Sequence, residues 1–134
     1  MPDYRRLWIP GGTYFFTVNL LQRRGNDLLV RNIDLFQHAV VDTARWRRFR
    51  IDAWVVLPEH LHCIATLPSG DSDFASRWRR IKKTFSKQIP VTEHRSGARQ
   101  RRGERGIWQR RYWEHLIRND TDYRNHIDYI HYNP

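Results

Sequence analysis

The sequence has a single cysteine and no long apolar run. Cys63 is alone among 134 residues, so the chain cannot form an internal disulfide. This favours a reducing compartment, and we expect a cytoplasmic protein. No apolar stretch approaches the roughly 18 residues that cross a membrane, and no apolar signal-peptide core follows the N-terminal residues. We therefore expect no membrane partner.

Acidic residues are also scarce relative to basic ones. The 14 Asp and Glu are outnumbered by 24 Lys and Arg, which gives a formal net charge of +10 and a pI near 10.6. Such a balance suits a polyanion, nucleic acid before an anionic membrane, although an ordinary solvated basic surface would look the same. Hydrophobic content of 40% with 6 Trp, 6 Tyr and 6 Phe argues against disorder. The length predicts one domain over residues 1–134.

The pattern of apolar residues predicts alternating strands and helices. Asn32 is a candidate N-cap for the first helix, and Asn119 or Asp120 for the last. Pro58-Glu59 forms a hairpin turn, and the polar stretch 92–106 is expected to be a mobile loop. We expect strands over residues 13–20, 51–57, 61–67 and 108–117, and helices over 33–49, 74–89 and 121–132.

This order contains β-α-β-β-α-β, the ferredoxin-like arrangement. The predicted fold class is α+β, with one antiparallel sheet, two helices on one face and a C-terminal helix elsewhere. In the second helix, Phe74, Trp78, Ile81 and Phe85 recur at helical spacing and predict a single buried stripe. Basic residues occupy much of the remaining surface of that helix, namely Arg77, Arg79, Arg80, Lys82, Lys83 and Lys87.

Two histidines stand two residues apart at the start of a predicted strand. Because side chains alternate along a strand, His60 and His62 project from one face, while Leu61 and Cys63 project toward the core. Two imidazoles at this separation can share a metal ion. The simpler alternative is a pair of half-exposed histidines. Glu59 beside them favours the metal site.

The last predicted helix has two faces. Tyr123, Ile127 and Ile130 form its apolar stripe, while His126, Tyr129 and Asn133 lie on a second face. The Asn133 carboxamide could complete a metal site with the histidine pair. A phenol is a weak nucleophile at neutral pH unless a cation or a base assists it. Tyr129 is the candidate nucleophile, Tyr132 is its competitor, and an ordinary surface aromatic is the alternative.

Several sequence blocks lie along nearly the whole chain. They are residues 11–18 (GGTYFFTV), 53–62 (AWVVLPEHLH), 76–83 (SRWRRIKK), 107–115 (IWQRRYWEH) and 128–134 (DYIHYNP). In this order they resemble the REP-associated tyrosine transposases, which are single-tyrosine HUH endonucleases. The resemblance implies a ferredoxin-like fold and metal-dependent cleavage of single-stranded DNA.

The resemblance also implies roles for particular residues. The family's HUH histidines correspond to His60 and His62, its nucleophile to Tyr129 and its third metal ligand to Asn133. Insertion-sequence relatives usually carry Gln at that last position. The implied metal is Mg²⁺ or Mn²⁺, although imidazole ligands alone would equally suit Zn²⁺ or Ni²⁺. Family members usually continue past the Asn-Pro pair, so we expect the chain to be C-terminally truncated at Pro134.

The implied substrate is the repetitive extragenic palindrome (REP), a hairpin with a short guide tetranucleotide at its foot. Single strands are bound by positive grooves with stacking aromatics, and such a protein would act at the nucleoid. The residues expected to bind DNA are Arg5, Arg6, Arg77, Arg79, Arg80, Lys82, Lys83, Trp108, Arg110, Arg111 and Tyr112.

Three functions are compatible with these patterns. The leading hypothesis is a DNA endonuclease and strand transferase that forms a 5′-phosphotyrosine. The runner-up is a non-catalytic module that binds nucleic-acid hairpins, and the third is a metal-dependent hydrolase that uses water and forms no adduct. A complete set of His60, His62, Tyr129 and Asn133 favours the first, because a pure binder has no need of it. Both a monomer and a homodimer fit the sequence.

Overall fold

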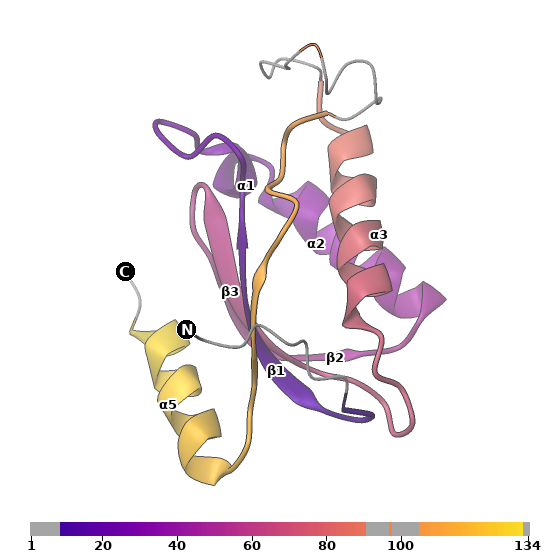
Figure 1. The fold of residues 1–134 in the computed structure, drawn as a ribbon. Coiled ribbons are helices and arrows are strands. Elements are labelled where there is room, and N and C mark those ends of the chain that lie inside the picture. The colour runs from indigo at the N-terminus through magenta and orange to yellow at the C-terminus, as the bar shows by residue number, and fades with distance from the viewer. Residues whose placement is uncertain (1–8, 91–96, 98–104, 133–134) are drawn as a thin grey trace.

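The sheet has four antiparallel strands in the order β2-β3-β1-β4 (Figure 1). The computed structural model describes residues 9–90, 97 and 105–132. With two βαβ connections feeding one antiparallel sheet, this is the predicted ferredoxin-like arrangement. The strands are β1 (Thr13–Asn19), β2 (Arg50–Val56), β3 (His60–Thr66) and β4 (Trp113–Leu116).

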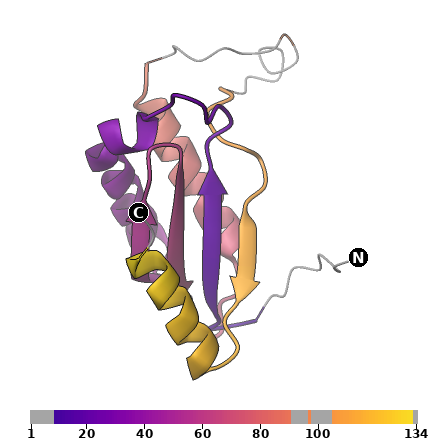
Figure 2. The same cartoon turned by 90° about the vertical axis from the view of Figure 1, so that its left-hand side faces the viewer.

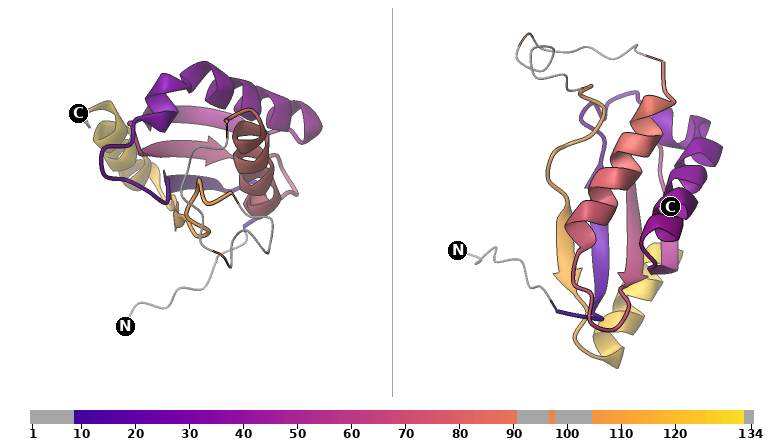
Figure 3. Two further views of the ribbon diagram at one scale, coloured as in Figure 1. Left: turned by 90° about the horizontal axis from the view of Figure 1, so that it is seen from above. Right: turned by 90° about the vertical axis from the view of Figure 1, so that its right-hand side faces the viewer.

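The helices lie on both faces of the sheet. α2 and α3 cover one face side by side, and α5 lies against the other (Figures 2 and 3). This confirms the predicted two-helix layer and the separate position of the C-terminal helix. No helix among the described residues combines the length and apolar character needed to cross a membrane. The helices are α1 (Leu28–Arg31), α2 (Ile33–Trp46), α3 (Phe74–Lys87) and α5 (Asp120–His131).

Two apolar clusters follow from the alternation of side chains in the strands. The larger lies between the sheet and α2 and α3, where Phe16, Leu61 and Cys63 are fully buried. The predicted stripe of α3 points into it, confirming the helical periodicity. The smaller lies under α5, where Ile130 packs with Phe15 and Ile64. Each strand thus contributes side chains to two separate environments.

The first long helix is shorter than its periodicity predicts. It ends at Trp46 instead of Phe49, and Arg47 is already extended. The reason is tertiary, because the carbonyls of Arg47 and Arg48 accept hydrogen bonds from the Arg77 guanidinium of α3. The side chain of Asn32 also does not cap α2, but donates to the carbonyl of Leu28, the first residue of α1.

The fourth strand covers only part of residues 108–117. Trp108 forms an isolated bridge with Leu20, and regular pairing with β1 begins at Trp113. Between them, the carbonyl of Gln109 accepts a hydrogen bond of 3.0 Å from Lys82 Nζ on α3. Gln109 N still donates to the carbonyl of Asn19, so the chain keeps contact with β1 here while its carbonyl bonds to α3. Most of the predicted loop over 92–106 lies outside the described residues.

Candidate functional site

The histidine pair lies on the sheet face that α5 covers. Leu61 and Cys63 point into the main core, so the pleat turns His60 and His62 the other way, as predicted. His62 is only 5% exposed, while His60 is half-buried. Their ring centroids are 4.9 Å apart and the rings are nearly perpendicular. The sequence correctly predicted the shared face but not the depth at which His62 is buried.

Each imidazole has one nitrogen held by a neighbour. His62 Nδ1 lies 2.8 Å from Thr17 Oγ1 on β1, and His60 Nδ1 lies 2.8 Å from Glu59 Oε1. Arg23 Nη2 also donates to that carboxylate oxygen. Burial, with a smaller contribution from nearby His60, lowers the pKa of His62 to about 4. His62 is therefore neutral near pH 7, which is the form that binds metals.

Within the described residues, no hydrogen bond engages Nε2 of either ring. A neutral imidazole whose Nδ1–H donates to an oxygen presents its other nitrogen as a metal ligand, a common arrangement around protein metals. The residues present therefore fit a bound cation. Asn133, the third ligand that the family resemblance implies, lies outside the described residues.

Helix α5 places one tyrosine beside this pair. The Tyr129 ring lies 5.1 Å from that of His62 and 5.8 Å from that of Phe15, with an edge-to-face orientation in both contacts. The Tyr129 side chain is otherwise open to solvent, at 52% exposure. Tyr132 is 77% exposed and contacts the ring of His131. Of the two candidate nucleophiles, Tyr129 is the one adjacent to the histidines.

The helix is fixed at its start and along its apolar stripe. The Asn119 side chain accepts a hydrogen bond from Asp122 N, which confirms the predicted N-cap. Tyr123, predicted to be core, is partly buried and its hydroxyl donates to Asp52 Oδ2. Burial and this acidic partner raise its pKa. Tyr123 therefore anchors α5 on β2.

A cluster that the sequence reasoning missed joins β4 to α5. His115 Nε2 lies 2.9 Å and 3.0 Å from the two carboxylate oxygens of Asp122. His126, one helical turn further on, stacks on His115 with ring centroids 4.7 Å apart. The spacing of Asp122 and His126 by four residues was a visible signal. Their partner His115 on β4 could not be recognised from sequence, because its proximity depends on how α5 lies on the sheet.

Six of the predicted DNA-binding residues gather in one groove between α3 and the segment 105–112. The groove has a volume of about 880 Å³ and combines basic with aromatic side chains. Trp108 and Tyr112 are partly buried there and also pack on the main core, so only part of each ring faces the groove. The six residues are Arg79, Lys82, Lys83, Trp108, Arg110 and Tyr112.

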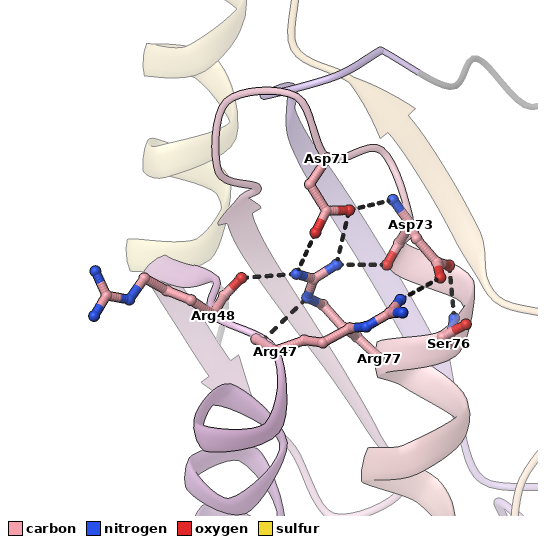
Figure 4. A network of polar contacts seen from close by, with 6 residues as sticks. All are labelled: Arg47, Arg48, Asp71, Asp73, Ser76 and Arg77. Carbon is pink, nitrogen blue, oxygen red and sulfur yellow. Dashed lines mark hydrogen bonds and ion pairs between the residues drawn. The ribbon is translucent and has the colours of Figure 1, made fainter.

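The prediction that Arg77 lies on the DNA-binding surface is wrong. Its side chain is 1% exposed and forms two hydrogen bonds, of 2.7 and 3.2 Å, with the Asp71 carboxylate (Figure 4). It also donates to three backbone carbonyls, those of Arg47, Arg48 and Asp73. The guanidinium thus satisfies backbone carbonyls of the loops around α3, and it cannot reach a phosphate.

The other predicted basic residues are dispersed. Arg80 is paired with Asp42 of α2 at 3.2 Å and lies over the ring of Trp46, away from the groove. Arg111 is exposed but does not line the groove. Arg5 and Arg6 lie outside the described residues.

An exposed tryptophan on the histidine face was missed. Trp113 pairs with Thr17 in the β1–β4 ladder, and paired residues point to the same face of a sheet. Thr17 is the residue that contacts His62, so Trp113 stands on the same face as the site, at 51% exposure. Its sequence position gave no signal, because the register of β4 on β1 is not encoded locally.

The groove and the histidine pair lie on opposite faces of the sheet. The groove borders α3, and the pair faces α5, which Figure 3 shows behind the sheet when α3 is in front. A ligand that reaches both must therefore pass around the sheet. This arrangement suits an extended polymer better than a small molecule.

Comparison with known proteins gives the family. No protein-family model matches the chain. The sequence is 53% identical over 134 residues to the REP-associated tyrosine transposase of Escherichia coli K12, covering all of this chain and 73% of that protein. A Haemophilus influenzae Rd protein provisionally assigned to the same family is 43% identical over 135 residues, with 100% and 76% covered.

A solved structure agrees with these relatives. The structure of a REP-associated tyrosine transposase bound to a REP hairpin superposes with a TM-score of 0.81 and is 51% identical, covering 100% of this chain and 73% of that one. The fold and the relatives therefore define the protein class as a DNA transposase. The chain belongs to the REP-associated tyrosine transposase family.

Proposed function

We propose that this chain cleaves single-stranded DNA at the foot of REP-type hairpins through a covalent 5′-phosphotyrosine formed by Tyr129. The observation that carries the proposal is the contact between Tyr129 and His62 on one sheet face, 5.1 Å between ring centroids. It brings Tyr129, which is exposed, next to His62, whose ring in turn lies 4.9 Å from that of His60. Membership of the transposase family supports the same reaction class.

The proposed step is a transesterification. The Tyr129 oxygen attacks the scissile phosphorus, the Tyr–O–P bond forms, and the bond to the 3′ oxygen breaks. The phenolic proton is lost to solvent and the departing 3′ oxygen takes one up. Because one ester replaces another, the reverse reaction can rejoin strands. A water nucleophile would leave no adduct, which separates this proposal from a simple hydrolase.

His60, His62 and Asn133 would hold a divalent cation, with Mg²⁺ or Mn²⁺ implied by the family. A cation bound there would polarise the phosphate and stabilise charge at the reacting oxygens. Thr17 and Glu59 would orient the two imidazoles by holding their Nδ1 atoms. The neutral state of buried His62 keeps its lone pair available near pH 7.

The groove beside α3 would bind the DNA backbone and the hairpin stem. Arg79, Lys83 and Lys87 line it from α3, and Trp108 and Tyr112 line its other side. This surface also supports the runner-up function, a hairpin-binding module without catalysis. We further infer that the protein acts on DNA in the cytoplasm, at the nucleoid.

An adduct experiment separates the two functions. Labelled REP-type hairpin DNA with an unpaired foot is incubated with the protein and Mg²⁺, and denaturing electrophoresis detects covalent product. We expect an adduct with the wild type and with Tyr132→Phe, and none with Tyr129→Phe or in EDTA. Binding should persist in Tyr129→Phe, because only a hydroxyl is lost.

Two results would contradict the proposal. An adduct formed by Tyr129→Phe but not by Tyr132→Phe would transfer the role to the other tyrosine. Binding without any adduct, in a wild type shown to be folded and supplied with Mg²⁺ or Mn²⁺, would leave the hairpin-binding module as the better description.

A further inference from the structure

Three potential metal ligands meet where β4 passes under α5. They are His115 on β4 and Asp122 and His126 on α5, and one ligand atom from each lies within 4.8 Å of the others. His115 faces the helix because it pairs with Phe15, whose ring packs under α5. The spacing of four residues puts Asp122 and His126 on one side of the helix. All three side chains are partly buried, so they remain within reach of an ion.

The carboxylate of Asp122 is the centre of the cluster. It faces His115 Nε2 at 2.9 Å and His126 Nδ1 at 3.1 Å, and it accepts a hydrogen bond from Arg118 N. Partial burial opposes its ionisation. The hydrogen bonds from His115 and from the backbone outweigh this effect, so the pKa of Asp122 lies below its ordinary value. One negative oxygen pair therefore faces two imidazole nitrogens.

We propose that His115, Asp122 and His126 form a second metal site, separate from His60 and His62, which takes Zn²⁺ or a similar late first-row ion. Two imidazoles and one carboxylate are a common ligand set for zinc, with water in the remaining position. Mg²⁺ prefers oxygen ligands in an octahedral arrangement, so it is a poor occupant. The site would select a different ion from the one implied for the histidine pair.

The distances from Asp122 to the two imidazoles need little change to admit the ion. Zinc bonds of about 2.0–2.1 Å place tetrahedral ligand atoms about 3.3 Å apart. The carboxylate already stands 2.9–3.1 Å from the two nitrogens. Binding would replace the contact between His115 Nε2 and Asp122 with a coordination bond, and the neutral ring would then carry its proton on Nδ1. His126 Nδ1 would also exchange its contact with the Asp122 carbonyl, now 2.8 Å, for the metal.

The expected role of the site is to fasten α5 to the sheet. The ring of Phe15 lies 4.7 Å from His126 and 5.5 Å from His62, so the cluster adjoins the histidine pair through one aromatic ring. Tyr129 follows His126 by one helical turn. A metal joining β4 to α5 would hold the helix that carries Tyr129 in position without taking part in the reaction. Its signature would be metal-dependent stability in a protein that lacks the histidine pair.

The test uses Zn²⁺ and a protein without the first site. His60→Gln/His62→Gln is stripped with EDTA, equilibrated with Zn²⁺, desalted and assayed by elemental mass spectrometry. We expect one zinc ion to stay with each chain and to raise Tm. Adding Asp122→Asn should remove both effects, because an amide keeps the shape and one acceptor oxygen but loses the charge and the second acceptor. His38→Gln in the same background, on an exposed histidine of α2, should change neither.

Two outcomes would overturn the proposal. The double variant could retain no zinc, or Asp122→Asn could retain as much zinc as its parent. If Asp122→Asn does not fold by circular dichroism, His115→Gln is measured in the same way. The Co²⁺ form adds a spectroscopic readout, since ligand-field bands lost on Asp122→Asn or His115→Gln would locate the ion. These measurements do not depend on DNA cleavage, so they are independent of the proposed Tyr129 chemistry.

Discussion

At the scale of single residues, Thr17 is the simplest control on the histidine pair. Its hydroxyl lies 2.8 Å from His62 Nδ1 and fixes the orientation of that ring. Thr17→Val keeps the shape but removes the partner. We expect metal affinity at the pair to fall by roughly 10–100-fold, the usual cost of losing such a partner. Mn²⁺ binding, measured by electron paramagnetic resonance, checks this.

Thr13→Val is a matched control on the same strand. Within the part of the chain that the structure describes, its hydroxyl bonds with that of Thr66 at 2.8 Å, and Thr13 stands four residues from Thr17. It should leave Mn²⁺ affinity unchanged. Equal losses in both variants would mean that a general effect on β1, not the orientation of His62, controls the affinity.

Trp113 is expected to stack on an unpaired base close to the tyrosine. It is 51% exposed and shares a sheet face with Thr17 and His62. Trp113→Ala should weaken binding of single-stranded DNA by roughly 1–3 kcal/mol, the range for one base–aromatic contact. Trp46→Ala, at 45% exposure on α2, removes a similar ring from the far side of the molecule. Fluorescence anisotropy should show weaker binding of single-stranded DNA only for Trp113→Ala.

At the scale of elements, the start of α3 depends on a buried arginine. Arg77 connects α3 to the 47–48 segment and to the turn before the helix, with Asp71 as its ionic partner. Removing one partner of a buried pair typically costs about 3–5 kcal/mol. We therefore expect Arg77→Met to lower the free energy of unfolding, measured in urea, by about this amount.

Arg79→Met is the corresponding surface change on the same helix. Arg79 is exposed and lines the groove, so its replacement should alter stability by less than about 0.5 kcal/mol. It should instead weaken DNA binding. The opposite result, with Arg77→Met stable and defective only in DNA binding, would restore Arg77 to the binding surface.

The same network predicts sensitivity to acid. Hydrogen bonds from Arg77, which outweigh partial burial, hold the pKa of Asp71 below its ordinary value. A depressed native pKa adds stability above the unfolded value, about 3.9, and this is lost as pH falls through the folded pKa. Wild-type stability should therefore drop from about pH 5 downward. Asp71→Asn should start lower and show a shallower fall, measured as urea midpoints against pH.

At the scale of the whole molecule, the positive groove predicts salt-dependent binding. Each contact between a basic side chain and a phosphate releases counterions from the DNA, so it should contribute a slope near −0.7 in log affinity against log salt for single strands. We expect a palindromic strand with an unpaired foot to bind more tightly than the same sequence as perfect duplex. Competition at fixed salt decides this, and equal affinities would reduce the groove to a general polyanion site.

Much of the fold followed from local periodicity. The stripe of α3, the hairpin around Pro58-Glu59 and the shared face of His60 and His62 depend on residues close in sequence, where a period of 3.6 or 2 fixes the direction of each side chain. For the same reason the sequence indicated a helix with Tyr129 on its polar side. The family resemblance then supplied the proposed roles, which stay predictions.

The tertiary structure decided what long-range contacts control. Arg77 occurs in a basic run and is nonetheless buried, because carbonyls 29 and 30 residues earlier converge with Asp71 on its guanidinium. His115 meets His126 only because α5 folds back over the sheet. Sequence spacing determines which residues share a face of one element, whereas the register and packing of distant elements determine which faces meet. The second cluster and the separation of groove from histidine pair could be found only in three dimensions.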